Sequence, residues 1–292
     1  MTIRVGVVGA AGRMGQLVCG ALLGASDFEL VAAVSPRHAR LPLARVSGLD
    51  TALVIAAELA ALKEAEADVA VDFTVPEVVG ENVSWYLEHG INAVVGTTGW
   101  TSEDLPRFAE LSREHGGNAI IAPNFALGAV LMMWFAQVAA RHMPDVEIVE
   151  LHHDGKRDAP SGTALRTADL IAASREQTFD SSPSAVPAVS VHPSQPLPGA
   201  RGAQRHGIHV HAVRLPGLVA HQEVLFGAQG QTLTIRHDAL DRTAFLPGVL
   251  LAVREVVSRR GVIVGLERLL GLEVLHPFRG GTPPRDDTGG IP

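Results

Sequence analysis

The chain has 292 residues, with 24 Lys or Arg against 31 Asp or Glu, so its formal charge at pH 7 is −7. Because 47% of the residues are hydrophobic and only 19% are charged, disorder of the whole chain is excluded. The acidic balance argues against nucleic-acid binding, which needs a basic surface. The single cysteine, Cys19, excludes a disulfide framework. Neither a signal-peptide pattern nor a run of about 18 apolar residues is present, so we expect a globular cytoplasmic protein without a membrane span.

Residues 1–125 alternate short β-branched runs with longer helical stretches, which is typical of βαβ units around a parallel sheet. The strands predicted here cover residues 3–8, 28–34, 69–73, 93–95 and 119–122. The helices predicted between them cover residues 13–23, 76–89 and 102–115, with one more helix within 39–67. The pattern predicts an α/β fold with an open, doubly wound parallel sheet.

The pattern changes after Asn124. Helices are predicted at 128–142 and 163–175, and strands at 147–152, 208–215, 221–226 and 231–237, of which the last three look antiparallel. Residues 176–206 are rich in Pro, Ser and Gly and predict a long surface loop. A helix over 243–258 is placed to return to the first sheet, and the Gly- and Pro-rich tail from about residue 276 predicts disorder.

A glycine-rich turn follows the first predicted strand and opens a helix, with the sequence Gly9-Ala10-Ala11-Gly12-Arg13-Met14-Gly15. Glycines allow a tight turn and a close approach to a pyrophosphate, and the free N–H groups of the helix start bind the anion. The spacing G-x-x-G-x-x-G is one residue off the commonest dinucleotide fingerprint. A tight turn without any ligand is the alternative interpretation.

Two more loops follow predicted strands of the same sheet. They are Gly96-Thr97-Thr98-Gly99 and Ala122-Pro123-Asn124-Phe125. In a doubly wound sheet the carboxyl ends of the strands form the binding crevice, and hydroxyl and amide side chains suit a ribose and a carboxamide. Each loop alone reads as an ordinary turn, but three at strand ends favour a bound dinucleotide.

The end of the second predicted strand bears on the choice of cofactor. NAD-selective domains usually carry Asp or Glu there, whereas this strand ends in Ser35-Pro36-Arg37-His38. Without a carboxylate, Ser35 and Arg37 are free to donate to a 2′-phosphate. We therefore expect NADPH to bind at least as well as NADH, the alternative being that Arg37 is a solvated loop charge.

The densest group of chemically active residues lies at 150–164. His152 or Lys156 is suited to donate a proton, and Ser161-Gly162-Thr163 at a helix start is suited to bind a carboxylate. The adjacent pair His152 and His153 is a poor metal site because no third ligand with the usual spacing is near, so no metal is expected. A nucleophilic Ser161 is disfavoured too, because no G-x-S-x-G sequence surrounds it.

These segments together carry a resemblance to a known family. The run E-L-H-H-x-x-K-x-D-A-P-S-G-T-A, the loops G-A-A-G-R-M-G, G-T-T-G and A-P-N-F, and H-x-A-x-x-R at 237–242 resemble dihydrodipicolinate reductase over about residues 3–272. The resemblance implies NAD(P)H-dependent reduction of 4-hydroxy-2,3,4,5-tetrahydrodipicolinate, with loss of water, in the diaminopimelate route of lysine biosynthesis.

The resemblance also implies an architecture. A Rossmann-like domain of residues 1–125 and 239–275 would bind NADPH or NADH. A smaller α+β domain, 126–238, would bind a small dicarboxylate substrate and form the sheet of a homotetramer. Residues 276–292 would be a tail.

By motif position, His152 resembles the family's proton donor or acceptor and Lys156 its second proton donor. His153, Gly162 and Thr163 resemble substrate-carboxylate contacts, and the loops at 9–14, 96–98 and 122–125 resemble cofactor contacts. One departure is the stretch at 213–217, which differs from the family's frequent R-G-G form.

Two other functions are the alternatives. Another two-domain NAD(P)-dependent dehydrogenase, acting on an amino-acid semialdehyde, would keep a glycine loop but has no reason to carry the 152–163 motif. A dinucleotide sensor without catalysis would lack a proton donor beside an anion site.

Overall fold

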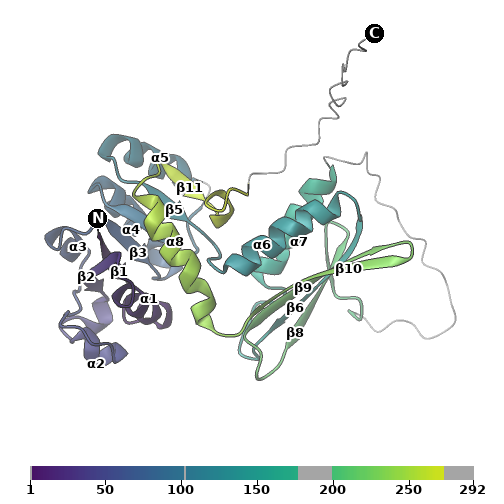
Figure 1. Ribbon diagram of the computed structural model, residues 1–292, viewed down its shortest axis with the longest axis horizontal. Coiled ribbons are helices and arrows are strands. Elements are labelled where there is room, and N and C mark those ends of the chain that lie inside the picture. Colours follow the sequence, from purple (N-terminus) through teal and green to yellow (C-terminus); the bar gives the residue numbers. More distant parts are fainter. Residues whose placement is uncertain (1, 102, 177–198, 273–292) are drawn as a thin grey trace, which may run out of the picture.

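The computed structural model describes residues 2–101, 103–176 and 199–272. Figure 1 shows two sheets side by side, a parallel sheet enclosed by helices and a mixed sheet with helices along one face. The chain passes from the first to the second after Phe125 and returns after Ala239.

The parallel sheet has six strands in the order β11-β5-β4-β3-β1-β2. Its strands are β1 (Ile3–Val8), β2 (Phe28–Val34), β3 (Val69–Asp72), β4 (Asn92–Val95), β5 (Ala119–Ile121) and β11 (Val262–Val264). Every pairing within it is parallel. The order reverses at β1, which lies between β2 and β3, so the predicted doubly wound sheet is confirmed.

Helices cover both faces of the parallel sheet. On one face α1 (Arg13–Leu23) and α8 (Leu246–Val256) bury side chains such as Leu22 and Val253 against β1 and β3. On the other face lie α3 (Ala60–Glu64), α4 (Pro76–Glu88) and α5 (Asp104–His115), which bury Tyr86 and Phe108. Burial on both faces explains why these strands are continuous apolar runs rather than alternating ones.

Two details of the first part differ from the sequence prediction. The single helix expected within 39–67 is replaced by two short ones, α2 (Leu43–Ser47) and α3, with Gly48 at a φ of 74° ending the first. A sixth strand, β11, was not predicted, and it pairs with β5 where α8 returns to the sheet.

The mixed sheet has the order β10-β9-β6-β8-β7. Its strands are β6 (Asp145–His152), β7 (Ala203–Arg205), β8 (Ile208–Arg214), β9 (Ala220–Ala228) and β10 (Gln231–Ala239). The antiparallel prediction is confirmed for β9 with β10. β8 is antiparallel to β7, but it pairs in parallel with β6, which separates it from β9. The chain passes through α7 (Gly162–Glu176) between β6 and β8, and such a crossover permits parallel pairing.

β7 falls within the loop predicted over 176–206, so that prediction is wrong at 203–205. Most of the loop, 177–198, and the tail from 273 lie outside the described residues.

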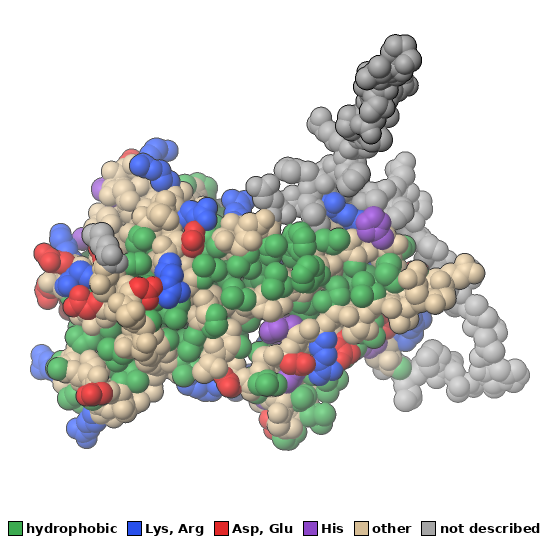
Figure 2. Space-filling view, viewed as in Figure 1, with side chains coloured by type: hydrophobic (Ala, Val, Ile, Leu, Met, Phe, Trp, Pro, Cys, Tyr) green, Lys and Arg blue, Asp and Glu red, His purple; other side chains and the backbone are tan. Residues whose placement is uncertain are grey.

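Helices α6 (Leu127–Ala140) and α7 pack on one face of the mixed sheet (Figure 1). Because side chains alternate along a strand, Ile148 and Glu150 of β6 point to these helices and are fully buried, while Glu147 and Val149 point to the other face. Figure 2 shows hydrophobic side chains gathered over α6 and α7 on the viewed face. Phe135 of α6 is half exposed. None of the described helices is long and apolar enough to cross a membrane.

Candidate active site

The glycine turn between β1 and α1 is built for a close approach of backbone to backbone. Gly9 has a φ of 82°, and a Cβ there would lie 2.5 Å from the carbonyl oxygen of Phe73. A Cβ on Gly15 would lie 2.1 Å from the carbonyl oxygen of Gly9. Both positions therefore require glycine, and α1 starts directly at the carboxyl end of β1.

The first turn of α1 is open to an anion. Gly12 is its N-cap residue, no side chain caps the helix, and no acidic residue occupies the first turn. Uncapped N–H groups at a helix start favour a pyrophosphate. The turn residues 9–14 thus fit a dinucleotide, although Ala10 is fully buried and has only backbone atoms to offer a ligand.

A buried carboxylate organises the neighbouring loops. Asp72, at the end of β3, has no exposed surface. It accepts hydrogen bonds from the backbone N–H (2.9 Å) and the hydroxyl (2.6 Å) of Thr74, and from the hydroxyl of Thr97 (3.2 Å). The Asn82 amide (3.0 Å) and the Tyr86 hydroxyl (2.8 Å) donate to its other oxygen. Asp72 therefore fixes the loop at 96–99 against the end of β3.

This network changes the interpretation of the 96–99 loop. The Thr97 hydroxyl donates to Asp72 and the residue is 8% exposed, so this hydroxyl helps to fix the loop. Thr98 is exposed and is left to meet a ligand. A Cβ on Gly96 would overlap the Phe73 ring, which explains the glycine there.

The loop at 122–125 places one polar side chain toward the mixed sheet. Ala122 and Phe125 are 2% exposed, and the Phe125 ring packs on Phe73 with centroids 5.9 Å apart. Pro123 is exposed. Asn124 accepts a hydrogen bond from the backbone N–H of Ala126 (2.9 Å), and this turn leads into α6. Of these four residues, Asn124 is the one whose side chain lines the pocket described next.

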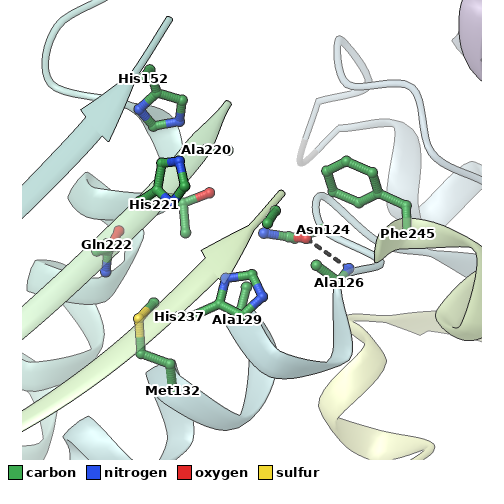
Figure 3. Close-up of a pocket in the computed structure, with 12 residues that line it drawn as sticks. Asn124, Ala126, Ala129, Met132, His152, Ala220, His221, Gln222, His237 and Phe245 are labelled. Atoms are coloured by element: carbon green, nitrogen blue, oxygen red, sulfur yellow. Dashed lines mark hydrogen bonds between the residues drawn. The ribbon is translucent and has the colours of Figure 1, made fainter. Parts of the chain in front are cut away.

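A pocket lies between the two sheets, where the 122–126 segment faces the ends of β6, β9 and β10 (Figure 3). Its lining residues are Asn124, Ala126, Ala129, Met132, His152, Thr163, Ala220, His221, Gln222, His237, Ala239 and Phe245. Three of them are histidines from three different strands. The pocket brings together the predicted residues His152, Thr163 and Asn124, which are far apart in sequence.

His152 belongs to a hydrogen-bond network centred on Glu150. Both residues lie on β6, two positions apart, and their side chains share the face toward the helices. The Nδ1 atom of His152 is 2.5 Å from Oε2 of Glu150. Arg214 of β8 donates to both oxygens of Glu150 at 2.8 and 2.7 Å, and the backbone N–H of Ser161 donates at 3.0 Å.

The two titratable groups of this network are shifted in a consistent way. Burial raises the pKa of the Glu150 carboxyl, but the hydrogen bonds from Arg214 and His152 together lower it below its ordinary value. Burial lowers the pKa of the His152 imidazole, and the hydrogen bond to Glu150 offsets only part of that effect. Glu150 is therefore ionised at neutral pH, and His152 is mostly neutral without a bound anion.

The segment at 156–163 lies beside this network and contacts it through Asp158 and Ser161. The Lys156 ammonium lies 2.8 Å from both oxygens of Asp158, which lowers the pKa of that carboxyl. Ser161 is buried, and its hydroxyl accepts from the backbone N–H of Ala164 (3.2 Å). The backbone N–H of Ser161 donates to Glu150. Gly162 is exposed at the start of α7, and Thr163 lines the pocket.

The structure does not bring every predicted residue into the pocket. His153 is exposed, and neither it nor Lys156 lines the pocket. Ser35 and Arg37 follow β2 in a short helical turn, Pro36–His38, at the carboxyl edge of the parallel sheet. The Oγ atom of Ser35 is 3.4 Å from Nδ1 of His38, and the Arg37 side chain is exposed.

Sequence reasoning missed Glu150, Arg214, His221 and His237 as members of the site. Glu150 and Arg214 are 64 positions apart, so no local motif joins them. The available signals were an acidic residue two positions before His152 on the same strand, and a charged Arg214 at the end of a buried strand.

Comparisons with known proteins agree with this geometry. Residues 3–125 match the family model described as dihydrodipicolinate reductase, N-terminus, and residues 128–270 match the C-terminus model. Relatives named 4-hydroxy-tetrahydrodipicolinate reductase include one from Nocardia farcinica, 50% identical over 274 residues, and one from Enterococcus faecalis, 47% identical over 268. These alignments cover 93% and 92% of this chain, and 100% of each relative.

Among solved structures, a dipicolinate-bound dihydrodipicolinate reductase from Paenisporosarcina sp. has a TM-score of 0.78 and 40% identity, covering 92% of this chain and 99% of that one. An amine dehydrogenase from Mycobacterium smegmatis shares the fold alone, with a TM-score of 0.65, 18% identity, and coverage of 92% of this chain and 96% of that one. The two family models and the two relatives together place the chain in the dihydrodipicolinate reductase family.

Proposed function

We propose that the chain reduces 4-hydroxy-2,3,4,5-tetrahydrodipicolinate to tetrahydrodipicolinate at the expense of NAD(P)H, with loss of water, in the diaminopimelate route of lysine biosynthesis. The observation that carries the proposal is the pocket that His152, Thr163 and Asn124 line together. It joins a proton-exchanging group and an anion-binding helix start to the edge of a dinucleotide-binding sheet. The names of the relatives agree with this activity.

The substrate's carboxylates are suited to the start of α7. The N–H groups of Gly162 and Thr163 and the Thr163 hydroxyl are suited to donate to an anion there, and His153 and Lys156 lie in the preceding segment. Lys156 adds a positive charge once a substrate carboxylate competes with Asp158 for it. The dipicolinate bound to the Paenisporosarcina protein is a dicarboxylate of the same kind.

The proton chemistry falls to His152 and Lys156. A bound nicotinamide supplies the hydride, and the negative charge that develops on the substrate needs a proton. The Nδ1 atom of His152 faces Glu150, so its other ring nitrogen is the one available to exchange a proton. A dianionic substrate raises the proton affinity of His152 and brings it toward the charged form.

The cofactor site is formed by the loops at 9–14, 96–98 and 122–125, and its fit to a nicotinamide dinucleotide is supported by the uncapped start of α1. NADPH is expected to bind at least as well as NADH, because β2 ends in Ser35 without a carboxylate and Arg37 is exposed nearby. Arg37 is free to pair with a 2′-phosphate.

We also propose that two domains share the site. Residues 1–125 and 239–275 form the domain that binds the cofactor, and residues 126–238 form the domain that binds the substrate. Support comes from α8 and β11, which pack into the parallel sheet although they follow the mixed sheet in sequence. The open face of the mixed sheet is the surface proposed for a homotetramer. The cytoplasmic location stays a prediction.

The experiment is a steady-state assay of the purified protein, following nicotinamide absorbance while the substrate is generated by a coupled reaction. We expect substrate-dependent oxidation of NADPH and of NADH. Oxidation of neither cofactor would contradict the proposal. An amino-acid semialdehyde offered alone should give no oxidation, and a rate equal to that with the coupled substrate would favour the other dehydrogenase instead.

A further inference from the structure

Glu150 is the most completely enclosed charged group of the mixed sheet, and all of its partners belong to the site. Its side chain has no exposed surface, and four hydrogen-bond donors surround it. A buried carboxylate would cost several kcal/mol if left unpaired, so these contacts are required for it to be ionised at all. They also tie together three separate segments of chain.

The first of these segments is β6 itself, through His152. Glu150 is ionised and is acceptor-only, so the Nδ1 atom that faces it carries a hydrogen in either protonation state of the ring. The neutral imidazole therefore has its free lone pair on Nε2. His152 lines the pocket, so this fixed tautomer presents Nε2 as the atom that exchanges a proton there.

The second and third segments are β8 and the loop that leads into α7. Arg214 binds both oxygens of Glu150 and also donates to the backbone carbonyl of Asp158 at 2.7 Å. The backbone N–H of Ser161 donates to Oε1 of Glu150. Glu150 and Arg214 therefore hold both ends of the 158–161 segment, which carries the proposed carboxylate site at Gly162 and Thr163.

We propose that Glu150, with Arg214 as its counter-ion, is the positioning residue that fixes His152 with Nε2 toward the substrate and holds the carboxylate-binding start of α7 at a set distance from it. This inference rests on the proposed function and assigns a role within that site. An amide cannot replace the carboxylate, because its NH₂ group would face a donor, either Arg214 or the Ser161 N–H.

The charged groups around His152 change the proton affinity of its ring, and this effect can be measured. Glu150 raises the proton affinity of the ring, while Arg214 of β8 and Lys156 lower it. His221 of β9 and His237 of β10 line the same pocket. Glu150 and Arg214 therefore change the proton affinity of His152 in opposite directions, although the loss of either residue breaks the same ion pair.

The experiment compares Glu150→Gln with Arg214→Gln in the full-length protein. In Glu150→Gln the alkaline limb of the pH profile of kcat/KM should move down by about one pH unit, and in Arg214→Gln it should move up. NMR of the imidazole nitrogens should show the Nδ1–H tautomer of His152 in the parent and a tautomer mixture in Glu150→Gln. We expect kcat to fall at least about tenfold in Glu150→Gln.

The matched control is Asp169→Asn. Asp169 of α7 is also paired with one arginine, Arg205, and one histidine, His206, but it does not line the pocket. This variant should keep the parent pH profile. If Glu150→Gln does not fold, Glu150→Asp, which keeps the charge, should restore folding and the Nδ1–H tautomer.

The inference would be overturned if both Gln variants kept the His152 tautomer and the alkaline limb of the kcat/KM profile of the parent. It would also be overturned if the alkaline limb moved in the same direction in both variants. The NMR readout needs no turnover, so it can fail or succeed whether or not the parent reduces the expected substrate. An inactive parent with the Nδ1–H tautomer would instead count against the proposed function.

Discussion

Two buried carboxylates organise the two halves of this molecule, and their surroundings differ. Asp72, in the parallel sheet, is surrounded by neutral donors from Thr74, Asn82, Tyr86 and Thr97. Glu150, in the mixed sheet, is surrounded by Arg214, His152 and one backbone N–H. Both have no exposed surface, so burial alone does not distinguish them.

The two sets of partners suit two different tasks, which are holding a loop in one conformation and exchanging a proton. Hydroxyl and amide donors fix the geometry of a loop but exchange no proton near neutral pH. A histidine partner does titrate in that range, so Glu150 couples the shape of its site to a protonation state. The first arrangement suits a cofactor that must be held, and the second suits a substrate that must be protonated.

The largest effect is expected from removal of the proton donors on the substrate side. His152→Gln and Lys156→Ala should each lower kcat about 10²–10⁴-fold, because a positioned acid contributes that much to proton transfer. Cofactor affinity, measured by calorimetry, should stay within about twofold of the parent, since neither residue belongs to the parallel sheet. Near-normal turnover in both variants would remove these residues from the chemistry.

On the cofactor side, Asp72→Asn should destabilise the protein by about 1–3 kcal/mol and weaken NADPH binding, because the new NH₂ group faces a donor in either orientation, the Thr74 N–H or the Asn82 amide. Denaturant titration and calorimetry measure the two effects. Thr97→Val is the milder companion, removing one donor only. If Thr97→Val weakened substrate binding but spared NADPH, the loop at 96–99 would belong to the substrate half.

A smaller effect is expected at the start of α7. Thr163→Val removes a donor from the pocket and keeps the shape of the side chain, so KM for the dicarboxylate should rise about tenfold while NADPH affinity stays unchanged. Steady-state kinetics at saturating NADPH give the first value. A variant with unchanged KM and weakened NADPH binding would move Thr163 to the cofactor side.

The smallest effect is expected at Arg37. This side chain is exposed, so its contact with a 2′-phosphate should contribute at most about 1 kcal/mol. Arg37→Ala should weaken NADPH about threefold to fivefold and leave NADH unaffected. Calorimetry with both cofactors decides the matter. Tighter binding of NADH than of NADPH by the parent would contradict the expected preference.

The sequence predicted the parallel half well because its signals are local. The bounds 3–8, 13–23 and 28–34 agree with β1, α1 and β2, since an apolar run, a glycine turn and a helical pattern follow one another there. β11 was not predicted, because it joins the sheet only through a long-range pairing with β5. The parallel pairing of β6 with β8 was missed because strand direction depends on a crossover rather than on composition.

In the site, His152 and Thr163 were predicted and lie in one pocket. The partners that hold them were not predicted, because Arg214 reaches Glu150 only through the pairing of β6 with β8. The hydroxyl of Thr97, a predicted cofactor contact, donates to Asp72, a partner that no local motif announces. Motifs identify groups that meet a substrate, whereas long-range packing decides which groups support them.

The most direct test of the two-carboxylate account is a crossed titration. NADPH, and then dipicolinate with NADPH saturating, are titrated by calorimetry into the parent, Asp72→Asn and Glu150→Gln. The account predicts that Asp72→Asn weakens NADPH at least about tenfold and spares dipicolinate, and that Glu150→Gln does the reverse. Equal weakening of both ligands in both variants would show that the two carboxylates support one common structure, which contradicts the account.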